Sequence, residues 1–534
     1  MRRAAFLFDL NRCTGCNACQ LACTIENGLP LDVSWRSVFT YNAAHHPTLP
    51  RFHLSLACNH CAAAPCMAGC PALAYRRDPE RGLVQVDATR CIGCRYCTWT
   101  CPYDALRYDA RHGVVSKCTY CAERLAAGRE PACTTGCPTG ALRTTTLDDA
   151  APRRAAAPRR VAATGSDPLG HATVPGFPDV GTQPSIRLVP LAPGRCQPAT
   201  GEEGLAAGPD APASPPLSLP PATPPSAAPR ISARGEWSLV VFTLLAATLV
   251  ALGGAASPGV ARLAAALPGG AGWSSAPPVP GPAGVLALVL VACAASLAHL
   301  GRPARAWRAV LGVRRSWLAR EVAGFGLFAA LLVLTRAAST AAGRDVAGAF
   351  TGAGAAVAGS SGRVGALDGE PAALAVVVLG LLVLATIDRV YAVTRGPVPH
   401  ALHSASVLGT GLFLMAVWIG AASLVLALGV VRGALYLWRQ SRRRGAARAA
   451  AASSTTAFAG RLTAIRLLGL AVPGLAVGLA PGAAWAPGVA LAAAWLGEIA
   501  DRTAFYDEIE VRTPARTIAA RLARDLAGGM PAGR

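Results

Sequence analysis

The fold is decided by the stretch from RCTGCNACQLAC (residues 12–23) to ACTTGCP (residues 132–138), which carries sixteen of the eighteen cysteines of this 534-residue chain. These cysteines form four groups of four. Groups one and three have the spacing C-x2-C-x2-C-x3-C, group two has C-x2-C-x4-C-x3-C, and group four has C-x2-C-x11-C-x3-C. Each group is a short run of thiols closed by a C-x3-C step, which is the ligand spacing of 4Fe-4S clusters.

The fourth cysteine of each group is expected to bind the cluster of another group. In the ferredoxin motif C-x2-C-x2-C-x3-C-P the last cysteine ligates the second cluster. Proline follows Cys70, Cys101 and Cys137 here, whereas Thr24 follows Cys23. Pairing group one with four and group two with three predicts two nested two-cluster modules. The predicted ligands are Cys13, Cys16, Cys19 and Cys137 (set 1); Cys118, Cys121, Cys133 and Cys23 (set 2); Cys58, Cys61, Cys66 and Cys101 (set 3); and Cys91, Cys94, Cys97 and Cys70 (set 4).

Structural zinc and disulfides are the alternatives to clusters. Zinc sites usually combine two C-x2-C pairs or mix cysteine with histidine, and they do not repeat a C-x3-C-P ending three times. Disulfide frameworks belong to small secreted domains, and we expect no secretory signal peptide before Cys13. We therefore predict four 4Fe-4S clusters, whose iron is held by the sixteen cysteines, and keep a zinc-binding membrane scaffold as a remote alternative.

The strongly basic composition does not indicate a nucleic-acid partner. The net charge is +21, but Lys117 is the only lysine, and much of the arginine lies between long apolar runs. Such a distribution is typical of membrane topology, and the mean hydropathy of +0.38 agrees with it.

Four regions follow one another along the chain. Residues 1–147 are predicted to form an α+β ferredoxin-like iron-sulfur domain, with short strands at Gly82–Asp87 and Gly113–Lys117. Residues 148–234 are rich in proline and alanine and read as a linker, in which residues 175–191 have the apolar content of a docking strap. Residues 235–510 are predicted to be an all-α polytopic membrane helix bundle, and residues 511–534 a C-terminal tail.

Seven transmembrane helices are predicted in the bundle, and an eighth, Val346–Gly359, is a weaker candidate. Runs of about twenty uncharged apolar residues are usually membrane spans. The runs are Trp237–Ala256, Ala283–Leu300, Val322–Thr335, Ala372–Ile387, Ser404–Val431 and Leu467–Gly497, the last long enough for two spans.

Arginine counts orient the bundle. The loop Gly301–Arg320 has six arginines and no acidic residue, so the positive-inside rule places it, and with it the iron-sulfur domain, on the cytoplasmic face. Arg432–Arg461 has seven arginines and no acidic residue, and also favours that face. Five spans before it would put it on the opposite face. Either the weak eighth span is therefore real, or the positive-inside rule fails at one loop.

Two ionisable residues at span ends are candidates for quinol chemistry. His299 ends the second span and Glu321 begins the third, at the bundle end expected to face the iron-sulfur domain. A histidine and a carboxylate can accept the protons that quinol oxidation releases. The alternative is an interfacial histidine and a first-turn acid that meets the helix dipole. No haem is expected, because the bundle offers only His299, His400 and His403, the last two in or beside a loop.

Two parts of the chain resemble subunits of the dimethyl sulfoxide reductase family of molybdoenzymes. Residues 1 to about 190 resemble its four-cluster electron-transfer subunit, in CNHCAAAPCMAGCP, RCIGCRYCTWTCPYDA and the strap PGFPDVGTQPSIR. Residues 236 to about 510 resemble its membrane anchor, in EWSLVVFTLL, SLAHLGRPARAW, SWLAREV, DRVY and LGEIADRTAFY. The chain therefore looks like a fusion of both subunits. The family anchor commonly has eight spans, and the stretch where its sixth should fall, Arg439–Thr456, is rich in arginine.

The resemblance implies a function. The chain would oxidise menaquinol at the positions corresponding to His299 and Glu321. It would pass electrons through four 4Fe-4S clusters to a separate molybdopterin subunit, which would reduce dimethyl sulfoxide or a similar acceptor in anaerobic respiration. The same architecture serving polysulfide, thiosulfate, tetrathionate, nitrate or formate chemistry is the alternative. The implied location is the bacterial cytoplasmic (inner) membrane, in contact with the lipid bilayer and the quinol pool.

Overall fold

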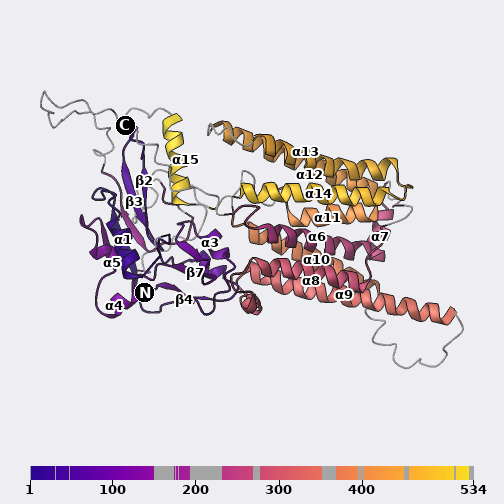
Figure 1. Cartoon of the computed structure of the whole chain (residues 1–534), viewed down its shortest axis with the longest axis horizontal. Coiled ribbons are helices and arrows are strands. Elements are labelled where there is room, and N and C mark those ends of the chain that lie inside the picture. The colour runs from indigo at the N-terminus through magenta and orange to yellow at the C-terminus, as the bar shows by residue number, and fades with distance from the viewer. Residues whose placement is uncertain are drawn as a thin grey trace. The chain divides into compact units, whose positions relative to one another are not determined.

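The computed structural model divides the chain into two compact units, Met1–Ala228 with Val511–Arg534 (unit 1) and Pro229–Glu510 (unit 2) (Figure 1). It describes residues 2–30, 32–46, 49–148, 174, 176–178, 180–192, 231–268, 273, 277–350, 369–394, 399, 402–449, 456–509, 511 and 513–527, without the side chains of 2, 148, 340–350, 444–449 and 456–459.

A three-stranded sheet joins the beginning and the end of the cysteine-rich part of unit 1. Its central strand β1 (Arg2–Asp9) pairs antiparallel with β8 (Leu142–Asp148) and parallel with β9 (Ile186–Val189). Phe6 and Phe8 are almost fully buried on either side of the more exposed Leu7, as expected for a strand with one face on a core. The sheet thus brings the two ends of the cysteine stretch together, and β9 lies within the residues predicted to form a strap.

Three hairpins and five short helices hold the cysteines of unit 1. The hairpins are β2 (Ser37–Tyr41) with β3 (Phe52–Leu56), β4 (Tyr75–Arg77) with β5 (Val84–Val86), and β6 (Leu106–Asp109) with β7 (Val114–Lys117). The helices are α1 (Ala18–Glu26), α2 (Pro65–Ala68), α3 (Tyr96–Thr100), α4 (Ala122–Ala126) and α5 (Ala132–Thr135). The predicted strands before cysteine groups three and four are confirmed as β5 and β7.

The segment predicted to be a tail is instead part of unit 1. Residues Pro514–Ala527 form helix α15, which contacts β2. The Tyr41 hydroxyl donates a hydrogen bond to Asp525 Oδ2 at 2.5 Å. Gly176, at φ +93°, leaves room for the side chain of Ile518 where a Cβ would collide with it. The end of the chain therefore packs on the domain that the beginning of the chain forms.

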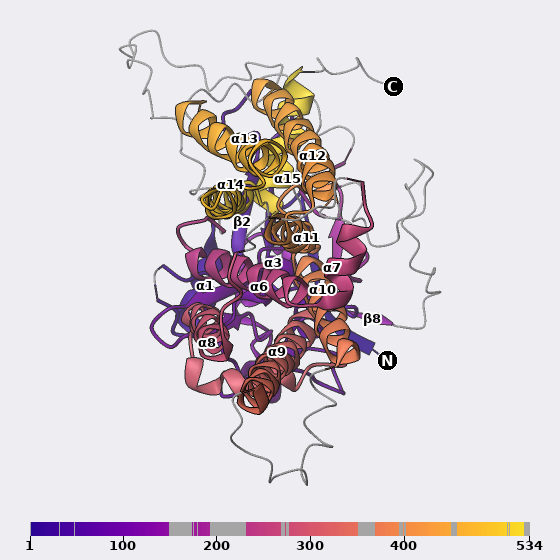
Figure 2. The ribbon, with the colours of Figure 1, turned by 90° about the vertical axis from the view of Figure 1, so that its right-hand side faces the viewer.

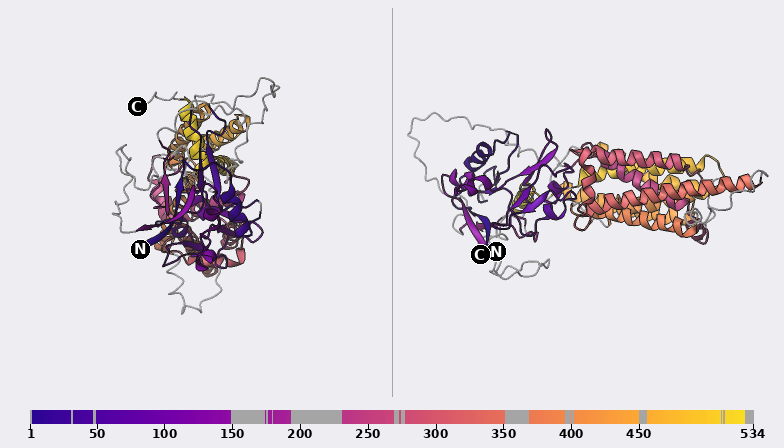
Figure 3. Two further views of the ribbon diagram at one scale, coloured as in Figure 1. Left: turned by 90° about the vertical axis from the view of Figure 1, so that its left-hand side faces the viewer. Right: turned by 90° about the horizontal axis from the view of Figure 1, so that it is seen from below.

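Unit 2 is a bundle of long helices. They are α6 (Trp237–Ala255), α8 (Pro282–Ala298), α9 (Trp317–Phe350), α10 (Glu370–Tyr391), α11 (Val407–Ile419), α12 (Ala422–Ala449), α13 (Thr456–Leu479) and α14 (Ala486–Glu508), with the short α7 (Pro258–Ala265) and the 3-10 helix η2 (Pro303–Val310). The helices run side by side, and the view along them in Figure 2 places α6 and α11 in the middle. The view from below in Figure 3 shows their nearly parallel axes.

Five helices in the described part of the chain are long and apolar enough to cross a membrane. They are Trp237–Ala255, Trp317–Ser339, Glu370–Tyr391, Ala422–Arg443 and Gly460–Leu479. Helix α8 and η2 qualify together as a sixth, with a bend of 101° between them, and α11 is shorter but apolar. Seven or eight spans remains a prediction. The weak candidate Val346–Gly359 begins in α9 and otherwise lies outside the described residues.

The apolar run Ser404–Val431, expected to be one span, is two helices. Gly420 ends α11 at φ +77°, and a Cβ there would lie 2.7 Å from the backbone nitrogen of Trp273, so only glycine fits this close turn. If α11 and α12 each cross the membrane, six helices precede the arginine-rich end of α12, and the two arginine-rich segments are then compatible with the same face.

The arginine-rich stretch Arg439–Thr456 is not the polar loop that its composition suggests, because α12 continues to Ala449. Arg432 and Arg439 of this helix are buried and face carboxylates of α14. Glu498 Oε2 lies 2.7 Å from Arg432 Nη2, and Asp501 Oδ1 lies 2.6 Å from Arg439 Nη1. Charge pairing of this kind makes a basic helix compatible with a membrane bundle.

Candidate iron-sulfur and quinol sites

The same left-handed backbone conformation recurs in all four cysteine groups. The residue before the second cysteine has a positive φ in each group, at Gly15, His60, Gly93 and Tyr120. A left-handed residue reverses the chain sharply, so each loop folds its cysteines back toward a common centre. Cysteine groups with different spacing therefore form similar loops.

The missing proline after Cys23 has a structural consequence. Helices α3 and α5 end before Cys101-Pro102 and Cys137-Pro138, and a left-handed residue follows three positions after each of these cysteines, at Asp104 and Gly140. Helix α1 instead continues through Cys23 to Glu26. Proline disfavours helix at the residue before it, and Thr24 removes that constraint.

Thiols of the predicted sets 1 and 2 lie near one another, although they come from the two ends of the cysteine stretch. Burial raises the pKa of Cys13, and the nearby thiols of Cys19, Cys137 and Cys16 raise it further. Burial likewise raises the pKa of Cys23 to about 12, with Cys133 and Cys121 among its neighbours. The fourth cysteine of group four thus lies with group one, and that of group one with group four.

In the predicted sets 3 and 4, thiols from two cysteine groups likewise lie near one another. Burial raises the pKa of Cys66, with Cys58, Cys101 and Cys61 adding to the effect. Burial raises the pKa of Cys94 to about 12, and Cys70 and Cys91 act in the same direction. Crowded thiols that oppose one another's ionisation suit a positively charged metal centre that removes their protons.

The four sets form a linear series. Cys19 of set 1 interacts with Cys23 of set 2, Cys118 of set 2 with Cys58 of set 3, and Cys66 of set 3 with Cys97 of set 4. All cysteines of the two inner sets are buried, whereas Cys16 of set 1 is exposed and Cys94 of set 4 is half-buried. Both ends of the series are therefore closer to solvent than its middle.

Backbone amides and hydroxyl groups support the sulfur atoms. Ala74 N donates to Cys70 Sγ and Tyr120 N to Cys118 Sγ, both at 3.3 Å. Ser55 Oγ lies 3.4 Å from Cys19 Sγ. Hydrogen bonds to the charged form favour a thiolate, so the donor set fits iron-sulfur ligation, with no cysteine of the four sets used in a disulfide.

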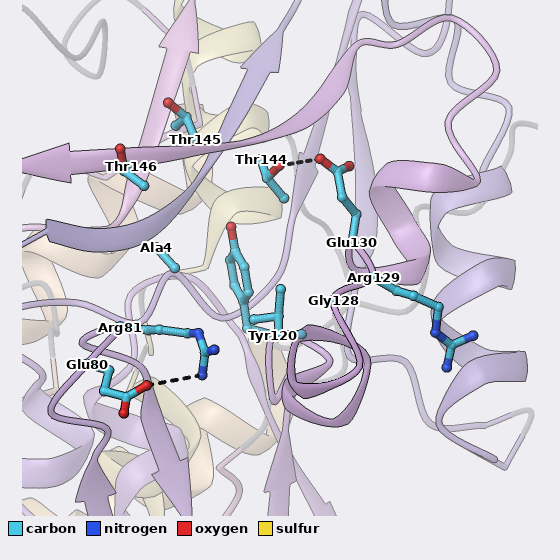
Figure 4. A pocket seen from close by; sticks show the side chains of 11 residues that line it. Ala4, Glu80, Arg81, Tyr120, Gly128, Arg129, Glu130, Thr144, Thr145 and Thr146 are labelled. Atoms are coloured by element: carbon cyan, nitrogen blue, oxygen red, sulfur yellow. Dashed lines mark hydrogen bonds and ion pairs between the residues drawn. The ribbon is translucent and has the colours of Figure 1, made fainter.

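A surface hollow of about 660 Å³ lies beside set 2 (Figure 4). Tyr120, which stands between Cys118 and Cys121, forms part of its wall, and Glu130 accepts a hydrogen bond from Thr144 at 2.8 Å. None of the residues that line the hollow is a cysteine. The clusters are therefore expected behind its wall rather than inside it.

The two quinol candidates lie at one end of unit 2. His299 directly follows α8, and Glu321 lies near the start of α9, with η2 in contact with both helices. Glu321 is only 7% exposed, and its side chain makes no hydrogen bond or ion pair with another residue that the structure describes. A buried carboxyl group of this kind is a functional candidate in a membrane bundle.

Two tyrosines near Glu321 were not singled out from the sequence. The hydroxyl groups of Tyr391, at the end of α10, and Tyr506, on α14, are hydrogen-bonded to each other, and Glu321 and Arg502 both interact with the pair. Both tyrosines end motifs that carry the anchor resemblance, DRVY and AFY. Their position at the ends of apolar runs was the available signal.

Of the other two histidines considered for haem, His403 is the one that the structure describes. His403 is buried beside Arg439, whose Nη1 lies 3.3 Å from His403 Nδ1, and against the ring of Phe505. His400 lies outside the described residues. His403 thus contributes to the charge cluster of the bundle.

Comparison with known proteins adds two family matches and several relatives. A "4Fe-4S dicluster domain" model matches residues 51–147, and a "DMSO reductase anchor subunit (DmsC)" model matches residues 232–337. One of the chains of the anaerobic dimethyl sulfoxide reductase of Haemophilus influenzae is 37% identical over 158 residues, which are 28% of the present sequence and 77% of that protein.

Relatives with other names match a similar length of the sequence. The thiosulfate reductase electron transfer subunit PhsB of Salmonella typhi is 43% identical over 147 residues, 27% of the present sequence and 76% of that protein. A sulfite dehydrogenase subunit of Allochromatium vinosum is 35% identical over 162 residues, 26% of the present sequence and 68% of that protein. The similar proteins thus include subunits named for dimethyl sulfoxide, thiosulfate and sulfite.

Proposed function

We propose a function for this chain from the premise that it belongs to the dimethyl sulfoxide reductase family, joining the iron-sulfur electron-transfer subunit and the membrane anchor subunit in one polypeptide. It is an electron-transfer and anchor component of an oxidoreductase complex and a multi-pass membrane protein. In our proposal it oxidises menaquinol and delivers the electrons through four 4Fe-4S clusters to a molybdopterin-containing catalytic subunit.

The observation that carries the quinol site is the buried carboxyl group of Glu321, which has no hydrogen-bond or ion-pair partner among the described side chains. Oxidation of a quinol releases two electrons and two protons. Glu321 and the imidazole of His299 accept the protons at the end of the bundle, because a carboxylate and a neutral imidazole are both proton acceptors. Water and the hydrogen-bonded tyrosines can then carry the protons away.

The four cysteine sets support the electron path. Each set offers four thiol groups, and neighbouring sets interact from set 1 through to set 4. A 4Fe-4S cluster in each set would relay one electron at a time. The more exposed ends of the series suit one exchange with the quinol site and one with the catalytic partner.

The terminal acceptor is dimethyl sulfoxide or a similar compound, reduced on the partner chain. The relatives named for dimethyl sulfoxide support this choice together with the anchor match. Thiosulfate is the second candidate, because a thiosulfate reductase subunit is 43% identical over 147 residues. Purifying the complex and assaying both acceptors distinguishes them. We place the iron-sulfur domain on the cytoplasmic face, and protease access to the linker in oriented vesicles tests that side.

Variants of the two quinol residues test the proposal. In His299→Ala and Glu321→Gln we expect loss of menaquinol-dependent reduction but retention of activity with a reduced viologen dye, which feeds the clusters directly. Asp388→Asn is not a suitable control, because both oxygens of Asp388 accept hydrogen bonds from the start of α11. Glu370→Gln is suitable, because Glu370 lies at the opposite end of the bundle in an exposed pair with Arg262. Loss of both activities in the His299 and Glu321 variants would contradict a specific quinol role.

Metal analysis tests the cofactors independently. The anaerobically purified protein should contain about sixteen irons and about sixteen labile sulfides per chain, as four 4Fe-4S clusters require. About four zincs without labile sulfide would instead support the zinc scaffold.

A further inference from the structure

Arg36 is a buried cation between two cysteine sets. Its side chain is 1% exposed and lies just before β2. Its main electrostatic partners are, in order, Cys133 of set 2, Cys19 of set 1, and Cys118 and Cys23 of set 2. A guanidinium group stays protonated in proteins, so a permanent positive charge stands where sets 1 and 2 meet.

The guanidinium group is only partly satisfied by the protein. Nη1 donates to Ser55 Oγ at 3.1 Å, and Ser55 Oγ in turn lies 3.4 Å from Cys19 Sγ. The Phe6 ring covers the group at 4.6 Å. Nε and Nη2 are buried and have no hydrogen-bond partner among the residues that the structure describes. Leaving two charged donors unsatisfied in an interior is costly, so a ligand is expected to accept from them.

The strongest electrostatic partners of Arg36 are the sulfur atoms of cysteines rather than carboxylates. Thiolates and the inorganic sulfides of an iron-sulfur cluster are hydrogen-bond acceptors with negative charge. The two N–H donors of Arg36 left unpaired by the described residues and its four neighbouring cysteines therefore indicate negatively charged sulfur as the acceptor. The role of Arg36 rests on the proposed cluster content of sets 1 and 2.

We propose that Arg36 is a positioning and tuning residue that donates N–H···S hydrogen bonds to the cluster sulfur atoms of set 2, and less strongly to those of set 1, and so raises their reduction potentials. When a cluster accepts one electron from its neighbour in the series, its total charge becomes more negative by one unit and no proton is taken up. A fixed positive charge and hydrogen bonds to sulfur both stabilise the reduced state.

Lys117 is a buried cation with a different arrangement. Its Nζ donates to the backbone carbonyl groups of Val84 and Cys118, so two of its three N–H donors already have protein partners. Arg107 is similar, since its guanidinium group donates to Ser34 O and to Asp104. Arg36 differs from both in having buried donors that the described residues leave open.

Redox titration of the purified full-length chain, followed by electron paramagnetic resonance, tests the proposal. In Arg36→Met we expect the midpoint potential of the set 2 cluster to fall, with at least about a tenfold loss in the reduced-to-oxidised ratio at a fixed potential. Set 1 should shift less, and sets 3 and 4 should not change, so they serve as internal controls. The set 2 signal is identified by its loss in Cys23→Ser.

Two further variants separate charge from fold. Arg36→Lys keeps the charge but moves the donors, so the potential should recover in part. Arg107→Met removes a satisfied arginine and should leave the set 2 potential unchanged. An unchanged set 2 potential in Arg36→Met, or an equal shift of all four clusters, would overturn the proposal.

A measurement on the unmodified protein covers the case in which Arg36→Met does not fold. The protein is produced in cells supplied with arginine that carries ¹⁵N only in its guanidinium group. The reduced set 2 cluster should then show an electron spin echo modulation from ¹⁵N. Its absence would overturn the proposal. Iron analysis of the same sample reports separately on the clusters, because a sample without iron contradicts the proposed function rather than the role of Arg36.

Discussion

Arg466 Nη1 on α13 lies 2.6 Å from Glu498 Oε1 on α14, and neither side chain is exposed. Arg432 Nη2 on α12 lies 2.7 Å from the other oxygen of Glu498. One carboxylate therefore joins three helices of the bundle. Because an unpaired charge inside a membrane protein is costly, Glu498 and the neighbouring Asp501, which pairs with Arg439 and Arg466, allow the arginines of α12 and α13 to remain inside.

Replacing Glu498 should destabilise the bundle strongly. Glu498→Gln leaves Arg432 and Arg466 without this shared negative charge, and removal of one partner from a buried pair typically costs about 3–5 kcal/mol. Thermal unfolding of the detergent-solubilised protein measures the loss. The control is Glu370→Gln, which breaks an exposed pair worth less than about 1 kcal/mol. Equal melting temperatures for the two variants would contradict the prediction.

Helices α13 and α14 should tolerate no side chain at their crossing point. A Cβ on Gly469 would lie 2.5 Å from Gly497 Cα and 2.7 Å from the carbonyl oxygen of Ala493. Both are backbone atoms that cannot rotate away, so Gly469→Ala should cost about 1–3 kcal/mol.

The matched control lies on the same helix. Nothing lies within 4 Å of the position that a Cβ on Gly478 would take, so Gly478→Ala should be neutral or stabilise by up to about 1 kcal/mol. The order of the two melting temperatures checks the contact, and the reverse order would exclude it.

The crosswise ligand sets make a prediction about single cysteines. Cys23→Ser should remove or convert the cluster of set 2, although Cys23 belongs to the first cysteine group in sequence, and should leave the cluster of set 1 intact. Electron paramagnetic resonance with iron analysis checks which signal is lost. Cys293→Ser, a change in α8, should retain all the iron. Loss of the set 1 signal in Cys23→Ser would mean that each group binds its own cluster.

The packing of α15 against β2 within unit 1 should weaken in acid. Burial opposes ionisation of Asp525, but the hydrogen bond from Tyr41 and the charge of Arg521 more than offset it and lower the pKa of the carboxyl group below 3.8. A depressed pKa gives stability that is present above the unfolded pKa of about 3.9 and lost as the pH falls through the folded value.

Hydrogen exchange over residues 514–527 checks this contact. Tyr41→Phe removes the donor and should speed exchange at neutral pH. Asp525→Asn should speed it as well and abolish its acid dependence. An acid dependence that persists in Asp525→Asn would assign the effect to another group.

The iron-sulfur region was largely predictable because its determinants are local. The spacing within each cysteine group limits which thiols can share a loop, and the C-P step indicates which cysteine is directed elsewhere. The departure at Thr24 was visible, but its effect was not, because whether α1 continues through Cys23 depends on the helix that forms around it.

The second half of the bundle was harder to predict for the opposite reason. The break at Gly420 interrupts an apolar run in which no charge or proline marks a boundary, and its cause is the distant Trp273. The arginines of α12 suggested a polar loop, since their acidic partners lie on α14. The tyrosine pair near Glu321 likewise forms only when α10 and α14 meet.

The sequence by itself determined the ligand chemistry, the cluster spacing, the two-part organisation and the candidate quinol residues, because these are properties of residue type and short spacing. Only the tertiary structure decided which carboxylates neutralise the buried arginines and which buried N–H donors lack a protein acceptor among the described residues. Arg439 and Glu508 are 69 residues apart and meet only in the folded bundle. The open donors of Arg36 likewise become evident only after every nearby protein acceptor has been placed.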